Sequence, residues 1–232
     1  MKKTYFIFIS LLLLTMSLEA QVYDDEIPSN SKNKIVFEEK QFHDFRFTIG
    51  GGYARRLGEI EKTNDAQVNK ILDGLINGYN IDFSMQYYLK QYWGIGINAY
   101  LNRQASDESQ VEINRTMYND ARESTNHIYV GPSFCVRTDL SSLFTFHGSV
   151  GLGMLYYIDR FEFGDQSITY QKPVFASYVS AAVDYNINNN MGAGLKLSVG
   201  GGTVAGEDFG KTERLSVSNF MLTGYLSFRI SK

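Results

Sequence analysis

The feature that most constrains this chain is a repeated alternation of apolar residues with small or polar ones. In the first such segment, Phe45, Phe47 and Ile49 alternate with Arg46 and Thr48. The pattern returns in further segments near residues 79–87, 93–102, 127–137, 144–156, 175–185, 191–200 and 220–230. Successive side chains of a β-strand point to opposite faces, so the pattern predicts strands that each have one apolar face.

Two architectures use strands of this kind, and the length of the segments separates them. A soluble sandwich or barrel turns its apolar faces inward, whereas a membrane barrel turns them toward lipid. Each segment runs for about ten residues, which matches a tilted membrane-spanning strand of about 9–11 residues rather than a soluble strand of about five or six. The sequence therefore predicts an all-β fold, an eight-stranded antiparallel up-and-down transmembrane β-barrel.

The less apolar face of the segments fits the inside of such a barrel. It carries glycine, serine and a few charged residues, and the interior of an eight-stranded barrel is only just wide enough for side chains. After the first 20 residues, the chain has no apolar run long enough for a membrane-spanning helix. A closed barrel is then the remaining way for the chain to cross a bilayer.

The start of the chain has the pattern of a secretory signal peptide. Two lysines precede an apolar run at residues 5–14, and the small residue Ala20 marks the predicted cleavage site. Residues 21–43 are polar and charged, which predicts a flexible periplasmic segment. The expected organisation is a signal peptide at 1–20, this segment, and a barrel at 44–232 in the bacterial outer membrane.

Short and long links alternate between the predicted strands. The short links lie at 89–92, 138–142 and 186–190, and the long polar links lie at 56–78, 103–125, 159–172 and 201–215. Outer-membrane barrels join their strands by short periplasmic turns and longer extracellular loops. The alternation predicts that both termini lie in the periplasm and that four long loops face outward.

Composition excludes several classes of function. A net charge of -3 provides no basic surplus for a nucleic-acid binder. The single Cys135 cannot form an internal disulfide, and His43, His127 and His147 lack metal-ligand spacing, so we expect no metal and no cofactor. Residues 205–212 resemble a loose phosphate-binding loop, but an alternating segment follows them instead of the required helix.

The sequence allows one hypothesis of an enzyme function. Some eight-stranded barrels modify lipids with a His and a Ser near the outer rim, and His127 and Ser124 lie near that rim here. The alternation places His127 on the inner face, away from lipid. We therefore expect a protein that is not an enzyme.

Charged residues fall on the inner face of the predicted strands at six positions: Arg46, Asp82, Arg137, Asp184, Lys196 and Arg229. Asp82 on the second strand is within reach of Arg46 on the first. A buried charge is costly unless it is paired. We therefore expect a structural network of ion pairs in the lumen, and a gated polar path is the alternative interpretation.

The first long link contains apolar residues at helical spacing: Val68, Ile71, Leu72 and Leu75. Asn64 or Asp65 would begin such a helix, and Gly74 or Gly78 would end it. The spacing predicts a short amphipathic helix at the barrel rim, with an extension of the hairpin as the alternative. An exposed apolar stripe on a loop also predicts a contact site for a partner.

These patterns cover nearly the whole chain after the signal-like start. They include glycine-flanked segments at 47–53 and 150–155, a strand end at 183–185 and a closing strand at 224–230. In them the chain resembles the small eight-stranded outer-membrane barrels of the outer membrane protein A and X superfamily, in particular its single-domain "outer membrane protein beta-barrel" branch. Barrels of that family commonly end on an aromatic residue, whereas this chain ends on Ser231-Lys232.

The resemblance implies an integral outer-membrane protein with a structural or surface-recognition role carried by its four long loops. It also implies three partners: outer-membrane lipid, the insertion machinery during biogenesis, and an extracellular ligand. One alternative is a narrow conduit for small or hydrophobic molecules, which needs glycines such as Gly94, Gly96, Gly192 and Gly194 to leave a continuous path. A lipid-modifying enzyme is the third function.

Overall fold

The computed structural model describes residues 44–232, with gaps at 59–61, 63–65, 114–115, 205–214 and 231–232. The predicted signal peptide and periplasmic segment lie outside the described residues. So does the segment that resembles a phosphate-binding loop.

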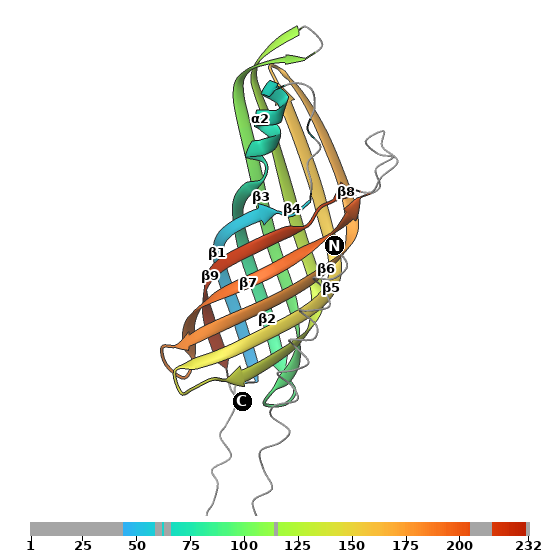
Figure 1. The fold of residues 1–232 in the computed structure, drawn as a ribbon. Helices are drawn as coiled ribbons and strands as arrows, with labels where there is room; N and C mark the ends of the chain where they lie inside the picture. The colour runs from blue at the N-terminus through green and yellow to red at the C-terminus, as the bar shows by residue number, and fades with distance from the viewer. Residues whose placement is uncertain (1–43, 59–61, 63–65, 114–115, 205–214, 231–232) are drawn as a thin grey trace, which may run out of the picture. The chain divides into compact units, whose positions relative to one another are not determined.

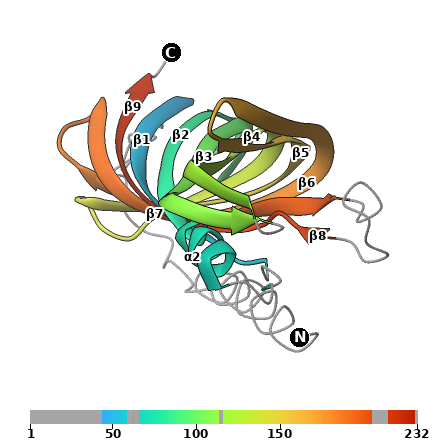
Figure 2. The ribbon, with the colours of Figure 1, turned by 90° about the horizontal axis from the view of Figure 1, so that it is seen from above.

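Eight antiparallel strands close into a barrel, as predicted (Figures 1 and 2). They are β1 (Phe45–Arg56), β2 (Asn77–Tyr88), β3 (Trp93–Ile113), β4 (Thr116–Asp139), β5 (Phe144–Phe163), β6 (Gln166–Asn186), β7 (Met191–Val204) and β9 (Asn219–Ile230). Each strand pairs with the next along the chain, and β1 pairs with β9 to complete the ring. A two-residue strand, β8 (Leu215–Ser216), extends the pairing of β7.

The outer face of the barrel is apolar and the inner face is polar, so the usual distribution of a soluble protein is inverted. Outward side chains such as Ile95 and Leu195 are 53% and 65% exposed, whereas Asp184 is 0% exposed on the inner face. We call the outward set the apolar belt: Ile49, Tyr53, Tyr79, Ile81, Phe83, Met85, Tyr87, Trp93, Ile95, Ile97, Leu101, Ile128, Val130, Phe134, Val150, Leu152, Met154, Tyr156, Phe175, Val179, Val183, Leu195, Leu197, Val199, Leu222, Leu226 and Ile230. Such a belt is stable only against lipid, so the barrel spans a membrane.

Short turns join the strands at one end of the barrel, where the sequence predicts them. They lie between β2 and β3, between β4 and β5, and between β6 and β7 (Figure 1). In the last of these turns, Asn188 Oδ1 accepts hydrogen bonds from the backbone N–H groups of Asn190 and Met191, at 2.9 and 2.8 Å. A side-chain acceptor of this kind stabilises a tight turn.

Strands β3, β4, β5 and β6 continue well beyond the apolar belt, and this corrects two of the predicted loops. These strands have 21, 24, 20 and 21 residues, against 12 for β1, β2 and β9. The links predicted at 103–125 and 159–172 are instead antiparallel hairpins, paired as far as Ile113 with Thr116 and Phe163 with Gln166. Backbone hydrogen bonds hold these strands together although neither face is apolar. The segments therefore lack the alternation by which the sequence predicts a strand.

We call the part of these four strands beyond the belt the projecting sheet: residues 103–113, 116–126, 158–163 and 166–171. Figure 1 shows it rising above the rest of the barrel. The turn between β5 and β6 is made at Gly164, whose φ of 55° favours glycine. The projecting sheet holds 11 residues of each of β3 and β4, about 35 Å along the strand, and six residues of each of β5 and β6, about 20 Å.

The predicted helix is present as α2 (Ala66–Gly74), but its apolar stripe is largely buried. Ile71 and Leu75 are each 1% exposed, and Ile71 clusters with Ala121 and Phe161 of the projecting sheet; Val68 and Leu72 are half-buried. The stripe therefore packs largely on the chain's own strands instead of being exposed as the sequence predicted, and its role as a contact site stays a prediction. The alternative N-cap residues at 64 and 65 lie outside the described residues.

Among the described residues, no helix is long and apolar enough to span a membrane.

Candidate functional site in the barrel lumen

The strongest interaction in the lumen joins Arg46 of β1 to Asp184 of β6. Arg46 Nη2 lies 2.8 Å from Asp184 Oδ1, and Arg46 Nε donates to Oδ2 at 3.2 Å. The two side chains are 1% and 0% exposed. A two-point contact between a guanidinium and a carboxylate has the geometry that makes a buried ion pair favourable.

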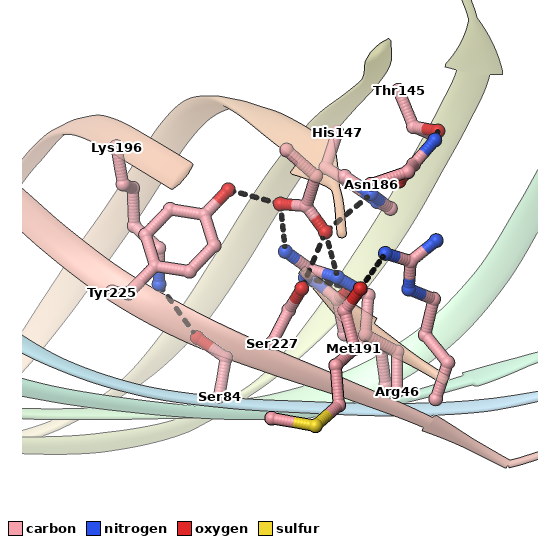
Figure 3. Close-up of polar contacts among 12 residues, drawn as sticks. Arg46, Ser84, Thr145, His147, Asn186, Met191, Lys196, Tyr225 and Ser227 are labelled. Carbon is pink, nitrogen blue, oxygen red and sulfur yellow. Dashed lines mark hydrogen bonds and ion pairs between the residues drawn. The ribbon is translucent and has the colours of Figure 1, made fainter. Parts of the chain in front are cut away.

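Three more side chains converge on the Asp184 carboxylate, from strands β5 and β9. The hydroxyl of Tyr225 donates to Oδ1, the hydroxyl of Ser227 donates to Oδ2 at 2.8 Å, and His147 Nε2 lies 3.5 Å from Oδ2. Figure 3 shows Arg46, Tyr225 and Ser227 pointing toward one carboxylate. Both carboxylate oxygens therefore have several partners, which compensates for the water that burial removes.

The network continues from Arg46 toward the short-turn end. Arg46 Nη1 donates to Gln86 Oε1 at 2.8 Å, and the Tyr88 hydroxyl lies 2.9 Å from both Gln86 Oε1 and His147 Nδ1. The chain of contacts thus returns to His147 and forms a closed cycle across the lumen. A cycle of this kind holds each member in one rotamer.

A second buried pair joins Asp82 to Lys196, and it corrects the expected pairing of Asp82 with Arg46. Lys196 Nζ contacts Asp82 Oδ1 at 2.5 Å and donates to Ser84 Oγ at 2.9 Å. In the β1–β2 ladder Asp82 lies opposite Gly50, whereas Arg46 lies opposite Gln86. Four residues of strand separate Arg46 from Asp82, so each charge finds its partner across the lumen instead.

The other two predicted members, Arg137 and Arg229, lie near the short turns and form different contacts. Arg137 Nε donates to the carbonyl of Gln91 at 2.6 Å, and its guanidinium lies 4.1 Å from the centre of the Tyr88 ring. Arg229 Nη2 donates to the carbonyl of Met191 at 3.1 Å. Among the six predicted residues, the structure therefore forms two carboxylate pairs and ties two arginines to turn carbonyls.

A layer of tyrosines fills the lumen between this network and the outer end. Tyr100 stacks on Tyr129 at 5.0 Å between ring centres, and Tyr129 stacks on Tyr178 at 5.6 Å. All three rings are at most 3% exposed. Stacked rings from β3, β4 and β6 occupy the middle of the barrel, where an eight-stranded interior has little spare width.

Glycines of β7 make room for large side chains in the lumen. A Cβ on Gly194 would lie 2.5 Å from the Tyr225 hydroxyl, and a Cβ on Gly200 would lie 2.6 Å from the Tyr100 hydroxyl. A Cβ on Gly192 would lie 2.6 Å from Arg229 Nη2. The space beside these inward glycines is occupied, so it does not form the continuous path that a conduit requires.

A separate polar cluster lies toward the outer end of the lumen. Thr125 Oγ1 donates to Gln104 Oε1 at 2.9 Å, Gln104 Nε2 donates to Asn219 Oδ1 at 2.8 Å, and Asn219 Nδ2 donates to His127 Nδ1 at 2.8 Å. All four residues are 0% exposed. An amide nitrogen can only donate, so His127 Nδ1 accepts the hydrogen bond from Asn219 and the proton of the ring lies on Nε2.

Two carboxylates lie above this cluster, beyond the apolar belt. Burial, with the neighbouring Asp159 carboxylate, raises the pKa of Glu123 to about 7, although Arg56 opposes the shift. Burial also raises the pKa of Asp159, which accepts a hydrogen bond from Tyr157 at 3.1 Å. The inner face of the projecting sheet therefore contains a group, Glu123, that changes charge near neutral pH.

The lipid-enzyme hypothesis lacks its pair of residues. His127 is buried on the inner face, and Ser124, three positions earlier on the same strand, points to the opposite face. In the described part of the chain, no group of three His, Cys, Asp or Glu residues is placed to hold a metal ion.

No family model matches the chain, and no curated protein matches its sequence. Among solved structures, the chain is similar to Neisserial surface protein A, with a TM-score of 0.51 and 10% identity over 81% of this chain and 97% of that one. It is also similar to the outer membrane protein OprG from Pseudomonas aeruginosa, with a TM-score of 0.51 and 10% identity over 83% of this chain and 99% of that one. The fold is that of the small eight-stranded outer-membrane β-barrels.

The sequence pattern missed the tyrosines of this outer-membrane barrel fold. Aromatic residues near the ends of membrane strands are typical of the lipid interface, but Tyr88 and Tyr157 are 1% and 4% exposed and point inward. Strict alternation would have shown this, since Tyr87 and Tyr156 already occupy the outward positions beside them. A ring on the polar face of a strand is the sequence signal that marks a filled lumen.

Proposed function

We propose that this chain is an integral outer-membrane barrel that presents a rigid recognition surface outside the cell. The projecting sheet is the observation that supports the proposal. Its strands remain paired for six to 11 residues beyond the belt, and α2 packs against them. A paired and packed sheet loses less conformational entropy on binding than a flexible loop does, so it suits recognition.

The proposal places the short turns in the periplasm and the projecting sheet outside. Export would use the signal peptide at residues 1–20, and the apolar belt would contact outer-membrane lipid. The insertion machinery would act during biogenesis, and an extracellular ligand would contact the sheet. Of the four long links that the sequence predicts, two are long hairpins, one carries α2, and the fourth is described only at residues 201–204 and 215.

The lumen network would serve as the structural base of this surface. The Arg46–Asp184 and Asp82–Lys196 pairs connect strands on opposite sides of the barrel. Cross-lumen contacts resist changes in the barrel's cross-section, which keeps the strands that carry the projecting sheet in a constant geometry. The occupied glycine positions favour this role over that of a conduit.

Conductance in planar bilayers tests whether the lumen is closed. We expect no conductance steps from the folded protein, and steps from the natural protein would show a path around the aromatic layer. Such a result would favour the conduit. The boiled and unboiled protein should migrate differently on a denaturing gel, which establishes that the barrel is folded in each sample.

A variant with a shortened β5–β6 hairpin tests whether the projecting sheet binds a ligand. Replacing residues 162–167 by Asn-Gly removes the tip of the β5–β6 hairpin while Phe161 and Ile168 stay opposite each other. Mass spectrometry should then show a ligand that co-purifies with the gently extracted natural protein but not with the shortened one. If both proteins retain the same molecules, the tip has no recognition role.

A further inference from the structure

The outward side chains that follow the apolar belt form a regular series on five adjacent strands. On β1 and β3 the first outward residue beyond the last belt residue is Arg55, after Tyr53, and Arg103, after Leu101. On β2 and β4 it is an asparagine, whereas on β5 it is Ile158 and the arginine is the next outward residue. The series is Arg55, Asn77, Arg103, Asn126 and Arg160, and we call it the arginine girdle.

Strand pairing places two pairs of these residues directly side by side, and the other neighbours in the series are offset from each other by two residues along the strands. Arg55 lies opposite Asn77, and Arg103 lies opposite Asn126. Neighbouring strands are about 4.8 Å apart, so the arginines of alternate strands are about 10 Å apart across the sheet and are offset by two residues, or about 7 Å, along it. Arg55 and Arg160 are exposed, and Arg103 is half-buried. The girdle therefore follows the upper edge of the belt as a band of hydrogen-bond donors.

Charge in the girdle has a single sign. None of its members is acidic, and the described residues include no carboxylate paired with Arg55 or Arg103. The first outward acids lie farther from the belt: Asp107, and Glu162, whose Oε1 lies 2.7 Å from Arg160 Nη2. Beyond the girdle, Arg122 lies opposite both Asp107 and Glu162, so the charges there are mixed.

The asparagines add to the donors of the band. The Tyr53 hydroxyl, in the last row of the belt, donates to Asn77 Oδ1. That contact uses the oxygen of the amide and leaves its N–H groups as donors. Guanidinium groups flanked by amides, at the height where lipid tails end, match a ligand with several strong acceptor oxygens.

We propose that the arginine girdle binds the phosphate groups of phosphorylated lipids in the outer leaflet. The inference rests on the proposed function, because it requires the projecting sheet to lie outside the cell. Contacts between arginine and phosphate are charge-assisted and multidentate, and each cation near an anionic membrane surface adds to the affinity. A protein partner is a poorer match, since the belt edge lies where lipid headgroups surround the barrel.

The test uses the folded, full-length barrel in neutral detergent, titrated with diphosphorylated lipid A and with the same lipid after removal of its phosphates. Native mass spectrometry counts the bound lipids. We expect the phosphorylated lipid to bind at least about tenfold more tightly, as several charge-assisted contacts imply. Arg55→Gln and Arg103→Gln should each weaken it about fivefold, and the triple variant with Arg160→Gln about a hundredfold.

Two control variants separate the girdle from general surface charge. Arg122→Gln lies in the mixed-charge region of the projecting sheet, and Lys90→Gln lies in the short turn at the opposite rim. Both should change the affinity less than about twofold. A triple Arg→Lys variant keeps a cation at each position but loses the multidentate geometry, so its affinity should lie between those of the natural protein and the triple Arg→Gln variant.

Three results would overturn the proposal: equal binding of the two lipids, unchanged binding by the triple Arg→Gln variant, or equal loss in the two controls. Complete displacement of the lipid by millimolar inorganic phosphate would also overturn it, because the girdle would then take free phosphate. The gel-mobility difference before and after boiling checks that every variant is folded. If the natural protein fails to insert into bilayers, the proposed function fails as well, whereas insertion without phosphate preference removes only this inference.

Discussion

Strands β3 to β6 pass through two environments, and the comparison shows how the surroundings of one sheet decide the chemistry of its faces. Within the apolar belt, outward residues such as Phe134 are exposed and inward residues such as Ser133 are buried. In the projecting sheet both faces carry polar residues, and α2 packs against the inner one. The backbone ladder is continuous across the boundary, because its hydrogen bonds do not depend on the solvent.

Ion pairs differ between the two regions in the same way. The Arg46–Asp184 pair is almost inaccessible to water, whereas the Lys62–Asp73 pair beside the projecting sheet has side chains 62% and 50% exposed. A buried pair depends on its partner because a single buried charge has no compensation. An exposed pair exchanges its partner for water at little cost.

The largest expected effect is the loss of the Asp184 carboxylate. Asp184→Ala leaves the Arg46 guanidinium buried without a counter-charge and removes the acceptor of Tyr225 and Ser227. We expect the free energy of unfolding to fall by about 4 kcal/mol, measured by urea unfolding in lipid vesicles. Asp73→Ala is the control in the exposed pair and should cost less than about 1 kcal/mol. Equal effects would remove the distinction between the two regions.

A smaller loss is expected from Asp82→Ala, which removes the partner of Lys196. Lys196 retains its hydrogen bond to Ser84, so we expect the free energy of unfolding to fall by about 3 kcal/mol. The double variant Asp82→Ala with Lys196→Met should recover part of this loss, since no unpaired charge remains. An unchanged unfolding midpoint in Asp82→Ala would contradict a stabilising role of the network.

The two faces of the barrel should also respond differently to one added methyl group. In Gly194→Ala the new Cβ would lie 2.4 Å from the Val183 carbonyl oxygen and 2.5 Å from the Tyr225 ring, so we expect a loss of about 2 kcal/mol. Gly224 lies on the outer face of the neighbouring strand, with no atom within 4 Å of its Cβ position. Gly224→Ala should be near neutral in the same unfolding assay. The comparison fails if the two variants are equally stable.

The smallest expected effect is a pH dependence confined to the projecting sheet. In the folded protein the pKa of Glu123 is about 7, whereas the ordinary pKa of a glutamate is 4.5. Folding therefore takes up a proton between these two pH values. Stability of the sheet therefore falls as pH rises through this window, by about 1–2 kcal/mol after allowance for partial exposure and for Arg56. Amide hydrogen exchange in β4 and β5 measures it.

Glu123→Gln is the matching variant, since it keeps the size and removes the titration. Its exchange rates, corrected for the intrinsic pH effect, should be nearly independent of pH between 5 and 8, apart from a residual slope of the same sign from Asp159. Residues of the lumen network should show the same protection in both proteins. A slope that persists unchanged in Glu123→Gln would assign the pH dependence to another group.

The sequence alone determined the strands of the barrel and the face on which most side chains lie. Period-two alternation depends only on local backbone geometry, so Arg46, Asp82, Asp184 and Lys196 could be placed inside without knowledge of the fold. The short turns and α2 were also readable, because their signals lie within a few residues. The polar hairpins were not, since their strands have no apolar face to mark them.

Tertiary structure decided which charges meet and what the helix faces. Arg46 and Asp184 are 138 positions apart, and Lys196 and Asp82 are 114 apart. Such contacts arise only when β1 and β9 close the ring and the stagger between strands sets which inward residues share a level. In the same way, Ile71 became part of the protein's own core because the β3–β4 hairpin extends far enough to receive it. Closure and strand length are properties of the whole sheet, and no local pattern encodes them.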